Sequence, residues 1–583
     1  MTAYLGVEQS LTGRRWVGPT DQEDRLAQSL RQQHDLPDML ARVLARLDVP
    51  ATEVPAFLDP KLRTEMPDPS RLRDMDAATE RLVAALKGRE RVAVFGDYDV
   101  DGGASSALLL RWLRHFGLTP TLYVPDRIDE GYGPNEPAMA ALGADHDLII
   151  CVDCGTLSIA PVAAARAAGA DVIILDHHLG GEHLPDACAV VNPNRQDADG
   201  ELDYLCAAGV VFLLLVSANR ALRAAGTDGP DLLGLLDLVA LATVADVAPL
   251  RGLNRVFVRQ GLKVMAGRGR PGLVALADLA KMNSAPAAYH LGFLLGPRIN
   301  AGGRIGKADL GARLLATDDL HEAQALAEEL DRLNRERRDI EAAVLDAALM
   351  QAEDRGTSGP LVWAAGEGWH PGVVGIVAAR LKEATNRPAV VIGLDGDEGK
   401  GSGRSISGVD LGSAIAACAR EGVLLKGGGH KMAAGLTVAR DQLEPAMDRL
   451  GALLARQGAD RAGPQDLRLD GLLAARAATP ELVEALDTAG PFGAGAPAPR
   501  VALSDMRIRF TREVGDGHLQ VTFSDAEGGR IDAIAFRAMQ GDLGPALVAH
   551  GGGVFHVAGR IEIDTWQGRR KVKLRLEDAA AAG

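Results

Sequence analysis

Cysteine is scarce in this chain of 583 residues, which contains five: Cys151, Cys154, Cys188, Cys206 and Cys418. So few cysteines at such irregular spacings do not indicate a disulfide framework. Cys151 and Cys154 form a CxxC pair, but no second pair accompanies it, as a zinc site would require. Because Cys151 closes an apolar run, we expect it to be buried packing rather than a redox group.

Long hydrophobic segments are also missing. The N-terminal sequence lacks the apolar core of a signal peptide. The most apolar run, residues 207–218, is shorter than the ~20 residues that a helix needs to span a bilayer. We therefore predict a cytoplasmic protein with no membrane partner.

The chain has no excess of positive charge, since its formal net charge is −15. This does not exclude a nucleic-acid partner, because a polyanion needs only a local basic track. Residues 500–575 hold 12 Lys or Arg against 9 Asp or Glu and include the basic run at 569–573. Part of the remaining acidity can belong to a metal site, where bound cations offset it. Non-specific binding at high salt should be weak.

The string GDYDVDGG, residues 96–103, is the most informative feature that is present. Its acids Asp97, Asp99 and Asp101 follow the apolar run 91–95, which predicts a buried strand, and precede a predicted helix. In α/β proteins such a turn lies at the carboxyl edge of the sheet, where ligands bind. Clustered carboxylates suit Mg²⁺ or Mn²⁺, although the string alone is equally typical of a solvated acidic turn.

Three further apolar runs, interpreted as strands, end in metal-ligand types. One ends at Asp153, the second continues into the sequence DHH at 176–178, and the third (232–244) ends near Asp246. If the strands are parallel neighbours, these groups converge at one edge of the sheet. The combination therefore predicts a joint metal site.

These motifs resemble those of the DHH phosphoesterase superfamily: GDYDVDG, VDCG, DHH and TVADVAPL occur in that order. Further motifs narrow the resemblance to the RecJ family of single-strand-specific DNA exonucleases: PDRIDEGYG (125–133), PRINAGGRIG (297–306), WHPGVVGIVAARL (369–381), GSGRS (401–405) and GGGHKMAAGL (427–436). The resemblance implies a metal-dependent 5′ to 3′ exonuclease that degrades single-stranded DNA to 5′-mononucleotides in DNA repair and recombination.

The resemblance implies two divalent cations, Mn²⁺ or Mg²⁺, which together can activate a water and stabilise the leaving oxygen. The family's metal ligands match Asp99, Asp101, Asp153, His177 and Asp246, with Asp153 as the bridging carboxylate. Many relatives carry a histidine where this chain has Phe95, so the ligand set of one ion is uncertain and Asp97 is a candidate to complete it.

Three residues are expected to act on the scissile phosphate. His178 is expected to face it, as a hydrogen-bond donor or as the acid for the leaving group. Arg298 and Asn300 lie in PRINAGG, and the guanidinium of Arg298 is suited to clamp a phosphate. The alternative for Arg298 is a structural ion pair.

Other matched residues are expected to bind the substrate's 5′ end. The resemblance places Arg127, Ser402 and Arg404 around the terminal 5′ phosphate. The resemblance also implies a cradle on the second lobe at Gly428, Gly429 and His430, where glycine lets the backbone approach an anion closely. A glycine run alone is more typical of a loop. A grip on the 5′ end beside the metals would favour exonucleolytic cutting.

We predict an α/β fold with five segments. Residues 1–85 form a helical lead-in that packs on the catalytic domain, and 86–317 form a doubly wound parallel-sheet DHH domain. Residues 318–356, with no Pro or Gly from 319 to 355, form a long connecting helix or a helix pair. Residues 357–460 form a second α/β domain, which the family identifies as DHHA1. Residues 465–577 form a β-barrel, which the family identifies as an OB-fold.

The barrel is predicted from alternating apolar patterns such as 518–524, 531–536 and 553–558. An OB-fold binds single strands with a basic groove and aromatic platforms. Most of the barrel's aromatic candidates are expected in the core, and only Trp566, beside the basic run, is expected to bind DNA; the candidates are Phe510, Phe523, Phe536 and Trp566.

Other functions remain as alternatives. A DHH-type oligoribonuclease or cyclic-dinucleotide phosphodiesterase shares the two lobes but typically lacks the barrel, and an inorganic pyrophosphatase needs no such barrel. A non-catalytic DHH scaffold of a replication complex would have lost metal ligands. The expected partner is single-stranded DNA with a 5′ end, and a single-stranded-DNA-binding protein and a helicase are further candidates. The chain is expected to act as a monomer.

Overall fold

The structure is a computed structural model that describes residues 3–126, 130–461, 465–566 and 569–582. The chain forms two compact units, each assembled from separate segments. One unit combines residues 1–66, 250–256 and 463–583, and the other combines residues 67–249 and 257–462. The larger unit contains the acidic motifs.

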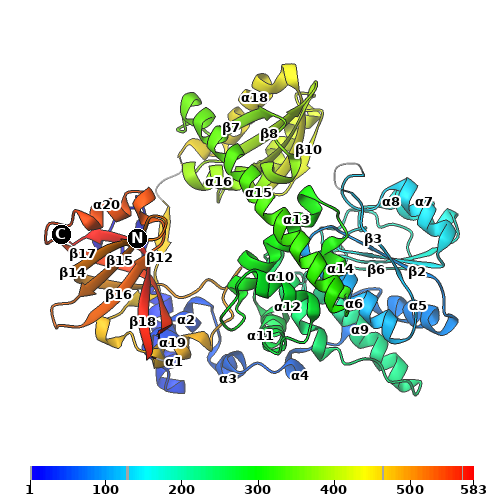
Figure 1. Cartoon of the computed structure of the whole chain (residues 1–583), viewed down its shortest axis with the longest axis horizontal. Helices are drawn as coiled ribbons and strands as arrows, with labels where there is room; N and C mark the ends of the chain where they lie inside the picture. Colours follow the sequence, from blue (N-terminus) through cyan, green and yellow to red (C-terminus); the bar gives the residue numbers. More distant parts are fainter. Residues whose placement is uncertain (1–2, 127–129, 462–464, 567–568, 583) are drawn as a thin grey trace. The chain divides into compact units, whose positions relative to one another are not determined.

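A five-stranded sheet forms the framework of the first lobe of the larger unit. All its neighbouring strands are parallel, in the order β3 (Thr121–Tyr123), β2 (Val92–Gly96), β4 (Leu148–Val152), β5 (Asp171–Leu175) and β6 (Ala189–Val191). Helices cover both faces (Figure 1): α7 (Glu136–Asp145) and α8 (Ile159–Ala167) on one, and α5 (Met75–Gly88), α6 (Val100–His115) and α9 (Ala207–Ala224) on the other. The predicted doubly wound sheet is confirmed.

Helix α9 is long and apolar enough to cross a membrane, which differs from the expectation that its apolar run was too short. The helix continues to Ala224, beyond the run at 207–218. However, 67% of it is buried inside the protein, where it packs against α5 and α6. Its apolar surface therefore belongs to the core of the lobe.

The apolar segment before Asp246 is a helix, so its interpretation as a strand was wrong. Helix α10 spans Leu236–Ala245 and is buried almost throughout. A buried helix and a buried strand give the same unbroken apolar run, and only length separates them. Further helices follow in the chain: α11 (Gly252–Ala266), α12 (Pro271–Leu279), the π-helix η5 (His290–Leu295), α13 (Gly296–Ile305) and α14 (Leu310–Ala316). The residues of α11 up to 256 are assigned to the smaller unit and the rest to the larger unit.

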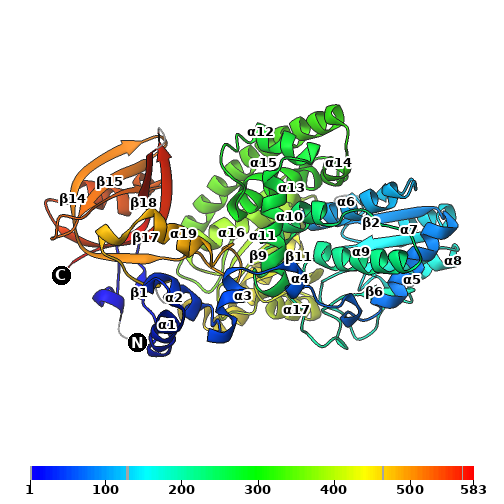
Figure 2. The same cartoon turned by 90° about the horizontal axis from the view of Figure 1, so that it is seen from below.

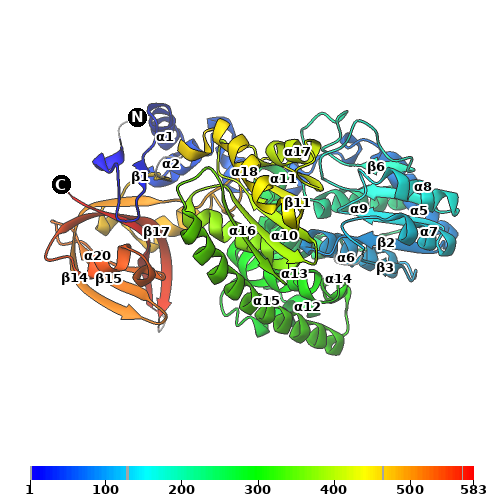
Figure 3. The ribbon, with the colours of Figure 1, turned by 90° about the horizontal axis from the view of Figure 1, so that it is seen from above.

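The predicted connection is a single helix, α15 (Leu320–Arg355), of 36 residues. It begins after Asp319, whose side chain accepts hydrogen bonds from the amides of His321 and Glu322. It ends at Gly356, which has a φ of 88°. Helix α16 (Pro371–Thr385) packs on the last turns of α15 (Figure 3).

A second five-stranded sheet follows, which confirms the second α/β domain. Its order is β10 (Lys426–Gly429), β11 (Ala433–Ala439), β9 (Glu398–Arg404), β8 (Ala389–Asp395) and β7 (Val362–Glu367). Only β7 and β8 are parallel; the other pairs are antiparallel. Helices α15 and α16 cover one face and α17 (Leu411–Arg420) and α18 (Leu443–Arg456) the other.

The smaller unit is built around a closed barrel, as predicted. Strand β14 pairs with both β15 and β17, β15 with β16, and β18 with both β16 and β17, so the sheet closes on itself. The strands are β14 (Val501–Val514), β15 (His518–Ser524), β16 (Arg530–Ala535), β17 (Val554–Trp566) and β18 (Arg569–Ala581). Short elements adjoin them: β12 (Asp466–Arg468), β13 (Gly471–Leu472), α19 (Pro480–Asp487) and α20 (Leu543–Val548).

The first 66 residues belong to this barrel unit, so the prediction that they pack on the catalytic domain was wrong for them. Leu30 and Leu44 share one core with Phe523 and Leu574 of the barrel. Figure 2 shows the helices of this segment beside the barrel. Helical periodicity reveals an apolar face but not which sheet the face will cover. The elements of this segment are β1 (Arg15–Val17), α1 (Asp21–His34), α2 (Asp38–Arg46), α3 (Val54–Leu58) and α4 (Leu62–Glu65).

Candidate metal centre

The acidic loop after β2 is folded tightly against the start of α6. Asp99 caps this helix, because its Oδ1 accepts hydrogen bonds from the amides of Asp101 (2.8 Å) and Gly102 (3.1 Å). A Cβ at position 102 would lie 2.4 Å from the carbonyl oxygen of Asp97, so only glycine fits there. The three carboxylates are thereby gathered at one edge of the sheet.

Asp101 is buried between this loop and α9. Its two carboxylate oxygens accept hydrogen bonds from the first amides of α9, those of Ala207 (2.6 Å) and Ala208 (2.8 Å). A helix N-terminus favours negative charge. Burial nevertheless raises the pKa of Asp101 above its ordinary value, and the charge of Asp99 adds to this effect.

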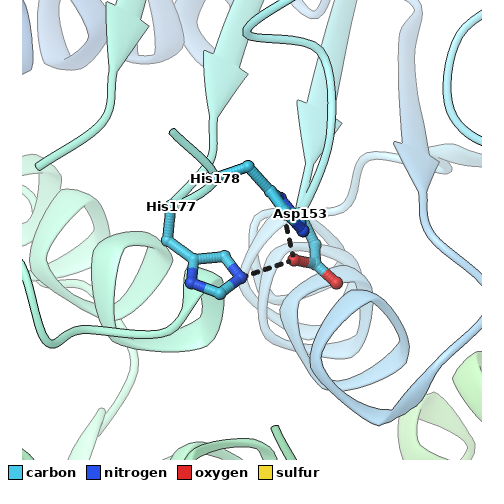
Figure 4. A group of neighbouring side chains, drawn as sticks. All are labelled: Asp153, His177 and His178. Atoms are coloured by element: carbon cyan, nitrogen blue, oxygen red, sulfur yellow. Dashed lines mark ion pairs between the residues drawn. The ribbon is translucent and has the colours of Figure 1, made fainter. Parts of the chain in front are cut away.

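Asp153 lies at the centre of the cluster, directly after β4. Its φ is 59°, in the left-handed region that residues other than glycine seldom adopt. Its Oδ1 lies 3.2 Å from Nε2 of His177, which follows the neighbouring strand β5 (Figure 4). Both atoms are buried, and neither makes a hydrogen bond to the part of the chain that the structure describes.

His177 faces two further carboxylates. Its Nε2 lies 3.7 Å from Oδ2 of Asp101 and 3.9 Å from Oδ2 of Asp246, which follows the end of α10. The ligand atoms of His177, Asp101 and Asp246 lie within 4.8 Å of one another, and those of Asp97, Asp99 and Asp153 do so as well. Asp153 belongs to the second group and also touches His177 of the first, as a bridging carboxylate would.

Three carboxylates of this cluster have no Lys or Arg beside them among the described residues. Burial, followed by the charge of Asp101, raises the pKa of Asp153 well above its ordinary value and that of Asp246 to about 8. Among the described residues, no Lys or Arg forms an ion pair with Asp101, Asp153 or Asp246. Carboxylate and imidazole groups whose buried atoms lack hydrogen-bond partners, as Asp153 Oδ1 and His177 Nε2 do among the described residues, fit divalent cations such as Mn²⁺ and Mg²⁺.

His178 is held differently from His177. Its Nδ1 lies 2.8 Å from Oδ1 of Asp176, and its Nε2 lies 3.2 Å from the hydroxyl of Tyr132. Burial opposes the charged form, but the hydrogen bond and charge of Asp176 outweigh burial and raise the pKa of His178 to about 9. Tyr132 donates to the carbonyl of Asp153 (3.3 Å), so its oxygen is left to accept from Nε2–H of a protonated His178.

Sequence reasoning missed the residues that orient the two histidines. Asp176 accepts hydrogen bonds from both histidine amides and from His178 Nδ1. Asn194 donates to the carbonyl of His177 (2.6 Å) and Asn192 to that of His178 (2.8 Å). Both asparagines closely follow β6. Their position after the end of another strand of the same sheet could have identified them in the sequence.

Phe95 does not face the cluster. It is fully buried on the face of the sheet that α7 and α8 cover, and its ring stacks on Tyr123 with centroids 5.3 Å apart. Cys151 and Cys154 are buried on the same face, which confirms that Cys151 is core packing. Asp97, by contrast, has a ligand atom within 4.8 Å of those of Asp99 and Asp153 and so lies in the second ligand group.

The structure gives Asn300 and Arg298 supporting contacts. Asn300 Oδ1 accepts a hydrogen bond from the amide of Val100 (3.0 Å), at the start of α6. Arg298 forms the ion pair that was the alternative for it, with its Nε 2.9 Å from Oδ1 of Asp331. One turn after Asn300, Arg304 Nη1 donates to the carbonyl of Gly372 in α16 (3.0 Å). Helix α13 therefore contacts the acidic loop and the second domain.

Two of the three predicted 5′-phosphate residues lie in the second domain. Ser402 and Arg404 are on β9, where Arg404 Nη1 donates to Ser402 Oγ (2.9 Å). A Cβ at Gly375 of α16 would lie 3.1 Å from each of these side chains, so glycine leaves them space. Their predicted partner Arg127 lies outside the described residues.

The glycine run forms the edge strand β10. Gly428 and Gly429 pair with β11, and His430 follows with an exposed side chain. Gly429 has a φ of 148°, which favours glycine. The contacts described here for Ser402 and for this run lie within the second domain, so their roles beside the acidic cluster stay predictions.

The barrel carries a groove of about 630 Å³ with two exposed aromatic rings. Phe510 is 55% and Phe536 53% exposed, whereas Phe523 is buried. The expectation that only Trp566 would be available was therefore wrong. Trp566 ends β17, and its side chain lies outside the described part of the chain.

The groove is balanced in charge. It is lined by Arg512, Lys573 and Arg575 and by three acids, Asp532, Glu562 and Asp564. Lys573 Nζ lies 2.5 Å from Asp564 Oδ2, and Arg575 Nη1 lies 3.8 Å from Glu562 Oε1. Aromatic surface rather than net charge distinguishes this groove.

Three family models match the chain in the order of its domains. The N-terminal domain of the DHH family matches residues 91–243, the DHHA1 domain 358–456 and the RecJ OB domain 469–578.

Curated relatives match over almost the whole chain. The single-stranded-DNA-specific exonuclease RecJ of Salmonella typhimurium is 37% identical over 93% of this chain and 96% of its own length. The Bacillus subtilis protein of that name is 32% identical over 97% of this chain and 71% of its own length.

Solved structures agree with these matches. The crystal structure of RecJ with Mn²⁺ from Thermus thermophilus has a TM-score of 0.81 and 30% identity, covering 97% of this chain and 79% of that one. A second, exonuclease RecJ bound to manganese, is 35% identical with a TM-score of 0.58 over 67% of this chain and 96% of that one. With three family domains in order and more than 30% identity over nearly the full length of a relative, the chain belongs to the RecJ family of DHH phosphoesterases.

Proposed function

We propose that this chain is a metal-dependent exonuclease that degrades single-stranded DNA from 5′ to 3′ and releases 5′-mononucleotides, in DNA repair and recombination. Its full-length relatives carry the name single-stranded-DNA-specific exonuclease. The observation that carries the proposal is the partly buried cluster of Asp101, Asp153, Asp246 and His177, whose carboxylates lack a compensating Lys or Arg among the described residues. A cluster of this kind suits phosphodiester hydrolysis with cations.

Two of three candidate groups of ligands support two Mn²⁺ or Mg²⁺ ions, and the third places His178 beside Asp153 and His177. Asp101, His177 and Asp246 would hold one ion, and Asp97 and Asp99 would hold the other, with Asp153 shared between them. Bound there, the cations would activate the attacking water, neutralise the phosphate and stabilise the leaving oxygen. Asn300 and Asp176 act as positioning residues, since they fix the acidic loop and the DHH turn.

His178 is the proposed donor to the reacting phosphate. Release of a 5′-mononucleotide breaks the bond between phosphorus and the 3′ oxygen of the terminal nucleotide, and the shortened strand again begins with a 5′ phosphate. A histidine kept protonated by Asp176 can donate a hydrogen bond to a non-bridging oxygen or a proton to that leaving oxygen.

The remaining substrate contacts are proposed from the matched motifs. Ser402, Arg404 and Arg127 would bind the terminal 5′ phosphate, and the backbone at 428–430 would support it. Arg298 would reach a neighbouring phosphate while Asp331 holds its guanidinium. In the barrel groove, Phe510 and Phe536 would stack on bases.

The cellular setting is proposed as well. We infer a cytoplasmic enzyme that acts as a monomer on single-stranded DNA, with a single-stranded-DNA-binding protein and a helicase as candidate partners. The RecJ OB domain matched at 469–578 favours the proposed exonuclease function over that of an oligoribonuclease or a cyclic-dinucleotide phosphodiesterase.

One digestion experiment tests the proposal. The purified chain is given 5′-phosphorylated single-stranded DNA, duplex DNA and RNA oligomers, with Mn²⁺ or Mg²⁺, and products are followed from both ends. We expect the single-stranded DNA to shorten from its 5′ end with release of mononucleotides, and the Asp153→Ala variant to be inactive. Equal cutting of duplex DNA, or shortening from the 3′ end, would contradict the proposal.

A further inference from the structure

A second hollow of the barrel unit has a different charge from the groove. Its volume is about 670 Å³. Five arginines and two carboxylates line it, and we call it the arginine pocket: Arg14, Arg500, Arg537, Arg560, Arg575, Asp542 and Glu577. The groove holds three cations against three acids, so the arginine pocket is the more positive of the two hollows.

One carboxylate serves two of these arginines. Glu577 Oε2 accepts a hydrogen bond from Arg500 Nε (2.6 Å), and its Oε1 lies 2.7 Å from Arg560 Nε. The second contact lacks hydrogen-bond alignment, and Arg560 Nε is buried without such a partner among the described residues. Two guanidiniums thus share a single negative charge.

Of the other arginines, Arg14 lies 3.6 Å from Asp578 and Arg575 lies 3.8 Å from Glu562, so the surplus rests on Arg500, Arg560 and Arg537. Burial, together with the charges of Arg500 and Arg575, lowers the pKa of Arg560. Arg537 is exposed and forms no ion pair within the described ranges of the chain. An anion in the pocket would relieve this repulsion.

The pocket also offers an aromatic surface that it shares with the groove. Phe536 and Arg575 line both hollows, and Arg575 Cζ lies 5.2 Å from the centre of the Phe536 ring. Phe536 stands half-exposed at this junction. A base on the ring would therefore place its phosphate next to the arginines, and a strand in the groove could continue into the pocket.

We propose that the arginine pocket binds nucleotide phosphates, with Phe536 as the platform for a base, and that it receives the single strand where the strand leaves the groove. The pocket includes Arg14, so the N-terminal segment contributes to it. The identity of the strand as DNA rests on the proposed function. A free mononucleotide offers the same chemistry and is the other source to test.

The test uses the full chain in EDTA, so that no strand is cut, and a thymidine oligomer about 30 nucleotides long, which exceeds the ~4–16 nucleotides that one OB-fold covers. Affinity is measured by fluorescence anisotropy over a range of salt. The variants are Arg537→Glu, whose exposed side chain has no ion pair to lose among the described residues, and Arg560→Gln. The control is Arg530→Glu, an exposed arginine of β16 that lines neither hollow.

Each lost phosphate contact should lower the slope of log affinity against log salt by ~0.7. We expect this decrease for Arg537→Glu and Arg560→Gln but not for Arg530→Glu, with melting temperatures confirming that all three are folded. Binding of dTMP and of inorganic phosphate is titrated in parallel. If dTMP alone loses affinity in the pocket variants, the pocket binds free nucleotides.

The inference is overturned if Arg537→Glu and Arg560→Gln keep the wild-type slope, or match Arg530→Glu, and dTMP binding is also unchanged. A separate assay distinguishes this from failure of the proposed function. Cleavage of short single-stranded oligomers with Mn²⁺ should proceed at the same rate in the wild type and in Arg530→Glu, which lines neither hollow. If the wild-type chain lacks that activity, the proposed exonuclease function is refuted. The dTMP titration then tests by itself whether the arginine pocket binds nucleotide phosphates.

Discussion

Asp153 Oδ1 and His177 Nε2 lie 3.2 Å apart, each just beyond the end of one of two adjacent parallel strands. The last paired residues of these strands are Val152 and Leu175, so the register itself sets the two side chains next to each other. Neither atom has a hydrogen-bond partner in the part of the protein that the structure describes. Such a contact is stable only with a shared proton or a cation between the two groups.

Asp153→Ala should abolish nuclease activity. The substitution removes the carboxylate that both ligand groups share, and loss of electrostatic stabilisation of this kind costs ~10³-fold or more in rate. The rate is measured on a 5′-phosphorylated single strand with Mn²⁺. Asp145→Ala, at an exposed position that ends α7, serves as the control and should keep wild-type activity. A folded Asp153→Ala enzyme with more than about a tenth of the wild-type rate would contradict the assignment, because the barrier would then have changed by less than ~1.4 kcal/mol.

Substitution of His177 and of His178 should have different effects on metal affinity. His177→Ala should weaken Mn²⁺ binding in calorimetry, because His177 Nε2 faces three carboxylates. His178→Ala should bind Mn²⁺ almost as the wild type does, because Asp176 keeps the His178 ring protonated and a protonated imidazole cannot ligate a cation. The variant should nevertheless cut slowly, because the Nε2–H of His178, which faces Tyr132 in this structure, is the proposed donor to the phosphate. Equal losses of Mn²⁺ affinity in both variants would show that His178 is a ligand too.

Metal binding should release protons at neutral pH. In the metal-free protein the pKa of Asp246 is raised to about 8, so its carboxyl is mostly protonated at pH 7. A cation needs the carboxylate, so Mn²⁺ affinity should rise with pH by up to ~10-fold per unit for each proton released, and level off above pH 8. Calorimetry at pH 7 in two buffers of different ionisation enthalpy counts the protons. Asp246→Asn should release fewer, and a wild-type protein that releases none would refute the raised pKa.

A 5′ phosphate should accelerate cutting. If Arg404 and Ser402 bind the terminal phosphate, a 5′-phosphorylated strand is cut faster than a 5′-hydroxyl strand, and Arg404→Ala reduces that ratio because a charge-assisted contact is lost. The measurement is kcat/KM on the two strands. Arg420→Ala, exposed at the end of α17, is the control in the same domain and should leave the ratio unchanged. If the wild type has the same kcat/KM on both strands, Arg404 and Ser402 do not bind the terminal 5′ phosphate.

Much of the metal centre could be predicted because parallel strands obey a simple rule. Asp153 and His177 follow apolar runs, and the carboxyl ends of neighbouring parallel strands share one edge. The long helix α15 was also predictable, since 36 residues without Pro or Gly run from a capping Asp319 to Gly356. In both cases the signal is local in sequence.

The rest depends on contacts that local patterns do not encode. Phe510 points outward because a β-bulge between Ile508 and Phe510 shifts the alternation of β14, and no residue type marks that shift. Asn300 supports the acidic loop from a distant helix, so its contact with Val100 depends on packing alone. Point substitutions are preferable to truncation after residue 504, since Leu30 and Leu44 would lose the barrel that covers them.

The joining of the N-terminal segment to the barrel also governs how the protein is made. Arg14 donates a hydrogen bond to the carbonyl of Glu577, 563 residues later. At a translation rate of ~5–20 residues per second, the ribosome reaches that partner roughly half a minute to two minutes after it has added Arg14. Throughout that interval the apolar sides of α1 and α2 have no barrel to cover them, while the two catalytic lobes can already be folding. The apolar N-terminal segment of the nascent chain is therefore exposed to aggregation until the last strands of the barrel emerge from the ribosome.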